Sequence, residues 1–266
     1  MSVRDLELAV REDGPEEGLP LLWGHCLLGD MGQDDDAHLL NWGELTSQTR
    51  VIRYDARGHG DSQTCYEEEA FHFSNLTQDL FALTDTLELD EFIAGGVSMG
   101  CALAIHAAVH SPERVKGLVL MAPPTAWDTR PRQAKLYRYA AHAVRLIGFF
   151  PLQFVGALSL PGGYDSPAVH LVHAMIRHAR DQDRRSAVAA FRGLAASDLP
   201  PAEVLAELKQ PTLILAWTGD PGHPISTAEK LVELMPHAEL HVVSKMNEAQ
   251  DWTKHVSEFV AAHKQE

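Results

Sequence analysis

The stretch AGGVSMG, residues 94–100, decides the fold of this sequence. An apolar run leads into it, and an alanine-rich helical pattern, 99–110, leads out. Gly96, Ser98 and Gly100 therefore form a G-x-S-x-G pattern between a predicted strand and a predicted helix, where a strained turn presents a serine hydroxyl at the top of a sheet. Phosphate-binding turns are also glycine-rich, but they need G-x-G-x-x-G or a Walker lysine, and this sequence has neither there. We predict that Ser98 is a nucleophile, flanked by glycines because a side chain at either position would collide with a neighbouring strand or helix.

Short apolar runs without polar alternation predict further buried parallel strands. The predicted strands are 19–24, 50–54, 91–96, 115–122, 211–217 and 238–243. Helical patterns lie between and after them, at 74–89 behind the possible cap Ser74, and at 99–110, 227–235 and 249–263. This alternation predicts an α/β fold with a doubly wound, mostly parallel sheet, whose functional site lies at the carboxyl ends of the strands.

Residues 126–204 interrupt the alternation. They contain no convincing strand, but 131–148 and 166–180 have helical patterns. We predict a helical cap at 126–204, inserted between two parts of one core, 1–125 and 205–266. Such a cap excludes water and shapes a pocket. The aromatic residues expected to pack in the cap or line an acyl pocket are Trp127, Tyr137, Tyr139 and Phe149.

Composition excludes several classes of protein. The 266 residues are 45% hydrophobic, enough for the core of one domain, and the net charge of −15 argues against nucleic acid as a partner. Cys26, Cys65 and Cys101 are an odd number without paired spacing, which predicts a reducing compartment and neither a disulfide framework nor a zinc site. The first ten residues lack the apolar core of a signal peptide, and no run is long enough to span a membrane. We expect a soluble cytoplasmic protein with no membrane partner; its oligomeric state stays open.

Five segments carry a resemblance to a known family. They are LLWGHCLLGD (21–30), VIRYDARGHGDS (51–62), GGVSMG (95–100), SPERVKGLVLMAPP (111–124) and PTLILAWTGDPGHP (211–224). Over nearly its whole length the chain resembles the α/β-hydrolase superfamily, and it is most similar to small bacterial esterases and enol-lactonases. The resemblance implies a Ser-His-acid triad, an oxyanion hole, and no cofactor.

The resemblance also suggests the two oxyanion donors. One is the backbone amide of Met99, the residue after the nucleophile. The other comes from the loop after the first predicted strand, where relatives have His-Gly and this chain has His25 and Cys26, followed by Leu27. We favour the Leu27 amide, with that of Cys26 as the alternative. Cys26 is a poor candidate for a second nucleophile, because it lacks the strained turn of Ser98.

Asp220 follows the strand 211–217 at the position where the superfamily has its triad acid. Asp, Pro and Gly in succession are also typical of a type II β-turn, which needs no catalysis. Both interpretations hold together, since a β-turn brings its ends within about 7 Å and would place His223 beside Asp220.

The base is harder to assign. The superfamily has its histidine in a loop after the last strand, but SKMNEAQ (244–250) contains none. His241 lies inside a predicted strand and His255 inside a predicted helix, from which neither easily projects over the sheet end. We favour His223, provided that it bridges the roughly 10 Å between strands two places apart.

Other histidines remain alternatives for the base. They are His25 and a cap histidine such as His170 or His173, and a chain with no working base is also open. As a metal pair, His170 and His173 lack a third ligand at a recognisable spacing.

Several charged residues are expected to have structural roles only. We expect Arg53, Asp55, Arg57 and His59 to hold the turn after the second predicted strand, and the acidic run at 34–36 to form solvated surface.

The sequence thus predicts a serine hydrolase acting on a small carboxylic ester, lactone or related acyl compound. Ser98 would attack, His223 would move the proton, Asp220 would orient the ring, and the Met99 and Leu27 amides would hold the oxyanion. One alternative is a noncatalytic binding protein of the same fold, suggested by the missing late histidine. Another is a cofactor-free lyase or carbon–carbon bond hydrolase on this scaffold.

Overall fold

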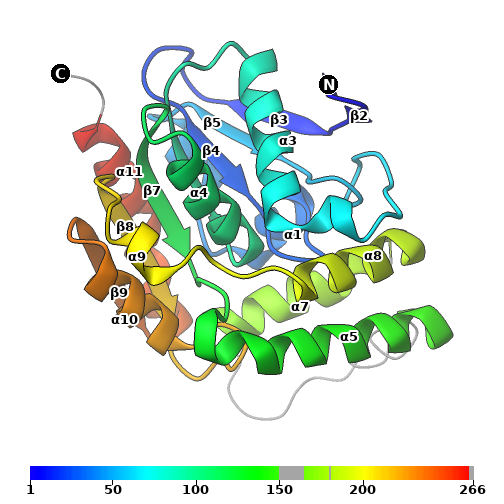
Figure 1. The fold of residues 1–266 in the computed structure, drawn as a ribbon. Coiled ribbons are helices and arrows are strands. Elements are labelled where there is room, and N and C mark those ends of the chain that lie inside the picture. The colour runs from blue at the N-terminus through cyan, green and yellow to red at the C-terminus, as the bar shows by residue number, and fades with distance from the viewer. Residues whose placement is uncertain (150–164, 180, 264–266) are drawn as a thin grey trace.

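A seven-stranded sheet forms the centre of the computed structural model, which describes residues 1–149, 165–179 and 181–263 (Figure 1). Its strands are β3 (Val10–Asp13), β4 (Leu21–Gly24), β5 (Val51–Tyr54), β6 (Phe92–Val97), β7 (Val115–Met121), β8 (Thr212–Trp217) and β9 (Ala238–Val243), while β1 (Ser2–Val3) and β2 (Leu6–Glu7) pair as a separate two-stranded antiparallel sheet. The sheet order is β3-β5-β4-β6-β7-β8-β9, and only the β3–β5 pair is antiparallel. The six predicted strands correspond to β4–β9, with ends within two residues of the predicted ones. The short strands β1–β3 were not predicted.

Helices connect the strands and follow them. The α-helices are α1 (Met31–Ala37), α2 (Trp42–Thr46), α3 (Phe73–Thr86), α4 (Met99–His110), α5 (Arg130–Ile147), α7 (Pro167–Ala179), α8 (Arg184–Ala195), α9 (Ala202–Leu205), α10 (Ile225–Leu234) and α11 (Trp252–Ala262). Short 3₁₀ turns are η1 (Glu69–Phe71), η2 (Trp127–Thr129) and η3 (Met246–Asp251). The prediction of Ser74 as a helix cap is wrong: α3 begins at Phe73, and His72 occupies the cap position.

The strands are apolar throughout because both faces of the sheet are covered. Leu22 and Ile214 pack into one hydrophobic core, to which α3, α4 and α10 contribute. Leu21 and Leu213, which precede them, pack into a second core with α2 and α11. Alternate residues of one strand thus enter different cores, as the period of two requires.

The long connection from β7 to β8 contains α5, α7, α8 and α9, and it has no strand among its described residues. In Figure 1, α5, α7 and α8 lie at the end of the sheet to which β7 points. Helix α5 packs against α8, and α7 packs against α1. The cap predicted at 126–204 includes residues 150–164 and 180, which lie outside the described residues.

The described residues contain neither a candidate membrane-spanning helix nor a candidate metal site. No helix there combines the length and the apolar character needed to cross a bilayer. No group of three or more His, Cys, Asp or Glu side chains there is arranged to hold a metal ion.

Candidate active site

Ser98 occupies a strained turn between β6 and α4. Its backbone has φ 54° and ψ −103°, a conformation that non-glycine residues rarely adopt and that occurs at functional sites. The flanking glycines are required sterically. A Cβ at Gly96 would lie 2.7 Å from the Gly100 Cα, and one at Gly100 would lie 2.6 Å from the Gly24 carbonyl carbon. The elbow therefore packs directly against the end of β4.

The structure brings Ser98, His223 and Asp220 into one hydrogen-bonded chain. The His223 Nε2 lies 2.8 Å from the Ser98 Oγ, and its Nδ1 lies 2.8 Å from the Asp220 Oδ2. β8 is two places from β6 in the sheet, so the loop after β8 passes beyond the end of β7. The His223 amide donates to the Asp220 carbonyl at 3.3 Å, which closes a β-turn. The same β-turn therefore places the Asp220 and His223 side chains next to each other.

Three donors hold the Asp220 carboxylate. Besides the His223 ring, the Trp217 Nε1 donates to Oδ2 at 2.9 Å and the Gly222 amide donates to Oδ1 at 2.8 Å. Burial by itself raises the pKa of Asp220, but the hydrogen bonds from His223, Trp217 and Gly222 outweigh it, and the pKa lies well below the usual value for aspartate. The carboxylate is therefore ionised and fixed toward His223.

Sequence reasoning missed the role of Trp217. Its ring stacks on Trp252 of α11, with centroids 6.1 Å apart, and lies edge-on to His223. The one available signal was an aromatic residue at the end of a predicted strand, three positions before the acid. A Trp there has its N–H close to the carboxylate while its body stays in the core.

The loop after β4 lies against the elbow, as an oxyanion loop requires. The Gly100 amide donates to the His25 carbonyl at 3.2 Å, and both Cys26 and Leu27 line the cavity that contains Ser98. Met99 is the first residue of α4, so its N–H has no partner within the helix. These positions are compatible with Met99 as one donor and with either Leu27 or Cys26 as the other.

His25 is not placed to serve as the base. Its Nε2 accepts from the Ala56 amide at 2.8 Å, so Nδ1 carries the proton, which it donates to the Cys26 carbonyl at 2.7 Å. Both nitrogens are thus occupied by the backbone, and burial lowers the pKa of the ring. Cys26 is equally unsuited to attack, since burial raises the pKa of its thiol far above neutrality.

The remaining candidate histidines lie elsewhere. His170 and His173 line a different hollow on α7, together with His38. The His241 and His255 rings contact each other at 4.1 Å between β9 and α11. None of these residues is among the described residues that line the cavity at Ser98.

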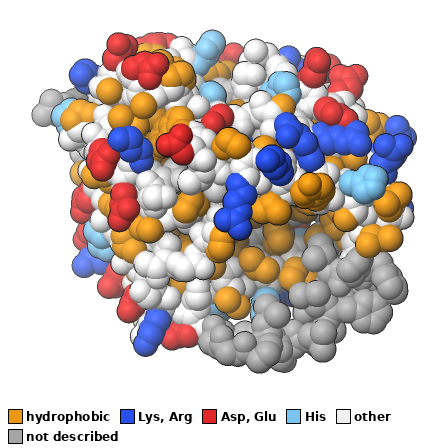
Figure 2. Space-filling model, turned by 60° about the horizontal axis from the view of Figure 1, so that its bottom comes forward, with side chains coloured by type: hydrophobic (Ala, Val, Ile, Leu, Met, Phe, Trp, Pro, Cys, Tyr) orange, Lys and Arg blue, Asp and Glu red, His pale blue; other side chains and the backbone are white. Residues whose placement is uncertain are grey.

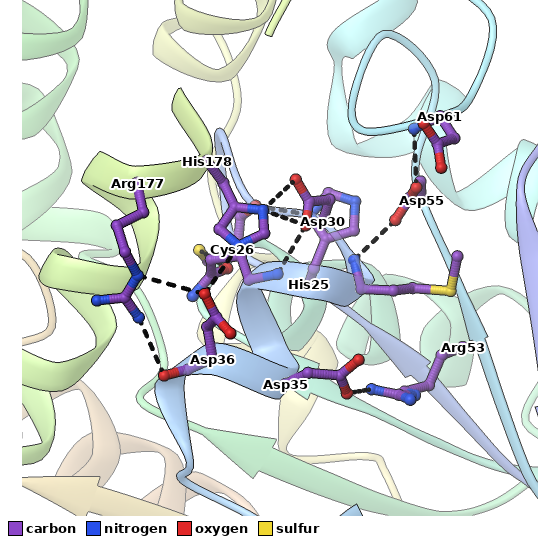
Figure 3. Close-up of polar contacts among 12 residues, drawn as sticks. His25, Cys26, Asp30, Asp35, Asp36, Arg53, Asp55, Asp61, Arg177 and His178 are labelled. Carbon is purple, nitrogen blue, oxygen red and sulfur yellow. Dashed lines mark hydrogen bonds and ion pairs between the residues drawn. The ribbon is translucent and has the colours of Figure 1, made fainter. Parts of the chain in front are cut away.

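Polar contacts fix the start of α1, directly after the loop that follows β4 (Figure 3). The Asp30 carboxylate caps α1 and lies 3.0 Å from the His178 Nδ1 of α7, and the His178 Nε2 lies 3.3 Å from Asp36. Asp55 accepts from the Met31 amide at 2.8 Å. The figure shows His178 beside Asp30 and Asp36, and Asp55 apart from them, so α7 and the loop after β5 each anchor the start of α1 by separate contacts.

The expectation that the acidic run at 34–36 is solvated is wrong for Asp34. Its side chain is buried, accepts from the Trp23 Nε1 at 3.2 Å, and has its pKa raised to about 8 by burial, against the effect of Arg53. Asp35 pairs with Arg53 at 2.5 Å. The run lies on α1, and the helix directs the side chain of Asp34 toward the core.

The other residues expected to be structural also make structural contacts. Arg57 forms an ion pair with Asp79 at 2.5 Å, and the His59 Nδ1 contacts the Arg57 carbonyl.

A cavity of about 490 Å³ opens beside Ser98 and His223. Its walls come from the loop after β4, the loop after β8, and α5, α7 and α8. Tyr137 and Phe149 line it, whereas Tyr139 is exposed. Figure 2 shows hydrophobic side chains gathered on this side of the molecule, below a row of Lys and Arg. The volume is typical of a small-molecule site.

Comparisons with known proteins agree with this geometry. Residues 18–251 match the family described as "Alpha/beta hydrolase family". The chain is 27% identical over 224 residues to 3-oxoadipate enol-lactonase 1 of Acinetobacter baylyi, covering 84% of this chain and 79% of that protein.

Solved structures share the fold. A thermophilic esterase from Thermogutta terrifontis superposes with a TM-score of 0.79 at 24% identity, covering 98% of this chain and 95% of that one. The enol-lactonase from Burkholderia xenovorans gives 0.71 at 22% identity, covering 98% and 97%.

Proposed function

This chain belongs to the α/β-hydrolase family, and we propose that it is a serine hydrolase that cleaves a small carboxylic ester or lactone through an acyl-enzyme. The observation that carries the proposal is the pair of 2.8 Å contacts that His223 makes, one to Ser98 and one to Asp220. A serine hydroxyl is a weak nucleophile without an adjacent base, and this geometry supplies one.

The partners of His223 favour one tautomer of its neutral ring. The ionised Asp220 accepts a proton donated by Nδ1, so the lone pair of Nε2 faces the Ser98 hydroxyl. In the first step the Ser98 Oγ bonds to the substrate carbonyl carbon, and its proton moves to the His223 Nε2. The Met99 and Leu27 amides stabilise the negative charge that forms on the carbonyl oxygen.

The tetrahedral intermediate then collapses. The bond to the leaving oxygen breaks as His223 returns the proton to it, which leaves the acyl group on Ser98. A water molecule attacks the acyl-enzyme, again with His223 as base, and the carboxylic acid departs. Asp220 orients the ring throughout and stabilises its charged form.

The position of His223 argues against the noncatalytic alternative. That alternative arose because no histidine follows the last strand, but the histidine of the acid's own turn lies within hydrogen-bonding distance of Ser98. The lyase and carbon–carbon hydrolase alternatives use the same scaffold, and a substrate panel separates them from ester hydrolysis.

A fluorophosphonate probe tests the proposal directly, because it labels serines that are activated as nucleophiles. We expect labelling of the wild type, none of Ser98→Ala, and strongly reduced labelling and ester turnover in His223→Gln with unchanged folding by circular dichroism. An unlabelled wild type would overturn the proposal. Unaltered turnover in His223→Gln would remove His223 from the mechanism.

A further inference from the structure

The part of the cavity formed by α5, α7 and α8 is almost entirely apolar. Val144, Leu171, Met175 and Phe191 line it, and Ala140 on α5 leaves room between them. Apart from the triad side chains, the Cys26 thiol, Gln133 and the Tyr137 hydroxyl supply its polar side-chain atoms among the described residues. Tyr137 is hydrogen-bonded to Gln133, so these two groups partly satisfy each other.

The same walls lack a cation. Among the described residues that line the cavity, no Lys or Arg is present, and the ionisable pair at Ser98 is Asp220 with His223. Residues 150–164, which follow α5 in the chain, contain no Lys, Arg, His, Asp or Glu in their sequence.

Arg130 lies behind the Tyr137 ring, with its guanidinium carbon 5.5 Å from the ring centroid. It does not line the cavity, and it donates to the carbonyls of Ser197 and Leu194 at 2.7 and 2.5 Å. It also donates to the Thr125 carbonyl at 3.4 Å and is hydrogen-bonded to Tyr137, so its donors are engaged within the protein and its charge lies behind the Tyr137 ring rather than in the cavity.

A carboxylate entering this cavity would lose its hydration without gaining a cationic partner among the described lining residues. Burying an unpaired charge costs several kcal/mol, and the fixed negative charge of Asp220 adds to that cost. A neutral alkyl or alkenyl chain meets no such penalty and gains from apolar burial. We infer that the acyl group accepted by this site is uncharged and apolar. This inference rests on the proposed function.

The inference predicts a substrate different from the one in the names of two relatives. Two curated relatives are named 3-oxoadipate enol-lactonases. A lactone of a dicarboxylic acid keeps one carboxylate free, and that group has no described counterion in this cavity. Substrates of this chain are instead esters or lactones of monocarboxylic acids.

Three p-nitrophenyl esters of one chain length test the inference. They are the hexanoate, the adipate half-ester with a free ω-carboxylate, and the adipate methyl ester, which matches the half-ester in size without its charge. We expect kcat/KM to fall at least about 100-fold from the methyl ester to the half-ester, after correction for spontaneous hydrolysis. Equal values for these two would overturn the inference while leaving the proposed function standing. Failure to cleave any of the three would instead overturn the proposed function.

A charge introduced into the wall provides the matched test. Val172 of α7 lines the cavity and is 38% exposed, so Val172→Arg adds a cation at a position that tolerates one. We expect the ratio of kcat/KM for half-ester over methyl ester to rise about tenfold in Val172→Arg, and to stay unchanged in the neutral control Val172→Gln. An equal ratio in both variants would count against charge as the determinant.

Discussion

Replacing Asp220 by Asn tests how the acid–base turn works. The carboxylate accepts from His223, Trp217 and Gly222, and an amide has only one oxygen to offer them. When the amide N–H₂ faces His223, Nδ1 must become the acceptor and Nε2 takes the proton. The ring can then no longer accept the proton of Ser98.

The magnitude follows from the geometry. A unit charge 2.8 Å from the protonated ring contributes about 6 kcal/mol at an effective dielectric constant of about 20. A loss of about 10⁴-fold in kcat corresponds to about 5.4 kcal/mol, so both estimates agree. We therefore expect Asp220→Asn to lower kcat for p-nitrophenyl hexanoate about 10⁴-fold, with KM changed much less.

The assay is initial-rate hydrolysis with active sites counted by fluorophosphonate titration after long incubation. Thermal unfolding followed by circular dichroism checks that the variant folds. The control is Trp217→Phe, which removes one donor to Asp220 but leaves the contact to His223, and we expect it to lose less than about tenfold in kcat. An Asn variant that keeps a tenth of the wild-type kcat would refute the role of Asp220.

Three further changes test other parts of the structure. Burial raises the pKa of Asp34 to about 8 from a starting value of 3.8, so the folded chain holds an extra proton between these pH values and the stability of the wild type falls as pH rises there. In urea unfolding, the free energy of unfolding of Asp34→Asn should rise relative to the wild type by about 1.4 kcal/mol per pH unit between about pH 5 and 8. A difference independent of pH would contradict this. Gly100→Ala places a Cβ against the Gly24 backbone, so it should lower the free energy of unfolding by about 1–3 kcal/mol and abolish fluorophosphonate labelling. Labelling of the variant at the wild-type level would argue against the close packing of the turn at Ser98. Ala140→Leu fills part of the cavity, so kcat/KM should fall more for p-nitrophenyl octanoate than for the acetate, and a parallel fall for both would place the acyl chain elsewhere.

The sheet was predictable because its strands are buried on both faces. Continuous apolar runs such as 211–217 indicate this burial directly. The turn at Ser98 was predictable because no residue larger than glycine fits at positions 96 and 100. The short strands β1–β3 gave no such signal, since β3 is largely exposed. Asp34 was misplaced for a related reason, because three consecutive acids look alike in sequence, while a helix turns one of them inward.

The lining of the cavity was less predictable than the triad. Tyr137 and Phe149 were identified as residues of interest, but Met175 and Phe191 come from two other helices, and their approach depends on how α5, α7 and α8 pack. Periodicity predicts which face of each helix is apolar, but it does not specify which neighbour that face meets.

Under the proposed mechanism, the position of His223 changes which parts of the fold must hold the catalytic residues together. In the family pattern, the acid and the base come from separate loops, so their contact depends on the packing of the last strand and helix. Here both belong to one β-turn, closed by the hydrogen bond from the His223 amide to the Asp220 carbonyl, so their 2.8 Å contact is set within four consecutive residues. The segment 244–250 can then carry Lys, Met and Glu and form η3 without a catalytic side chain.

The contact that still depends on long-range packing is the one between His223 and Ser98, across the end of β7. Destabilising α11 should therefore weaken activity through Trp217, which stacks on Trp252 and donates to Asp220.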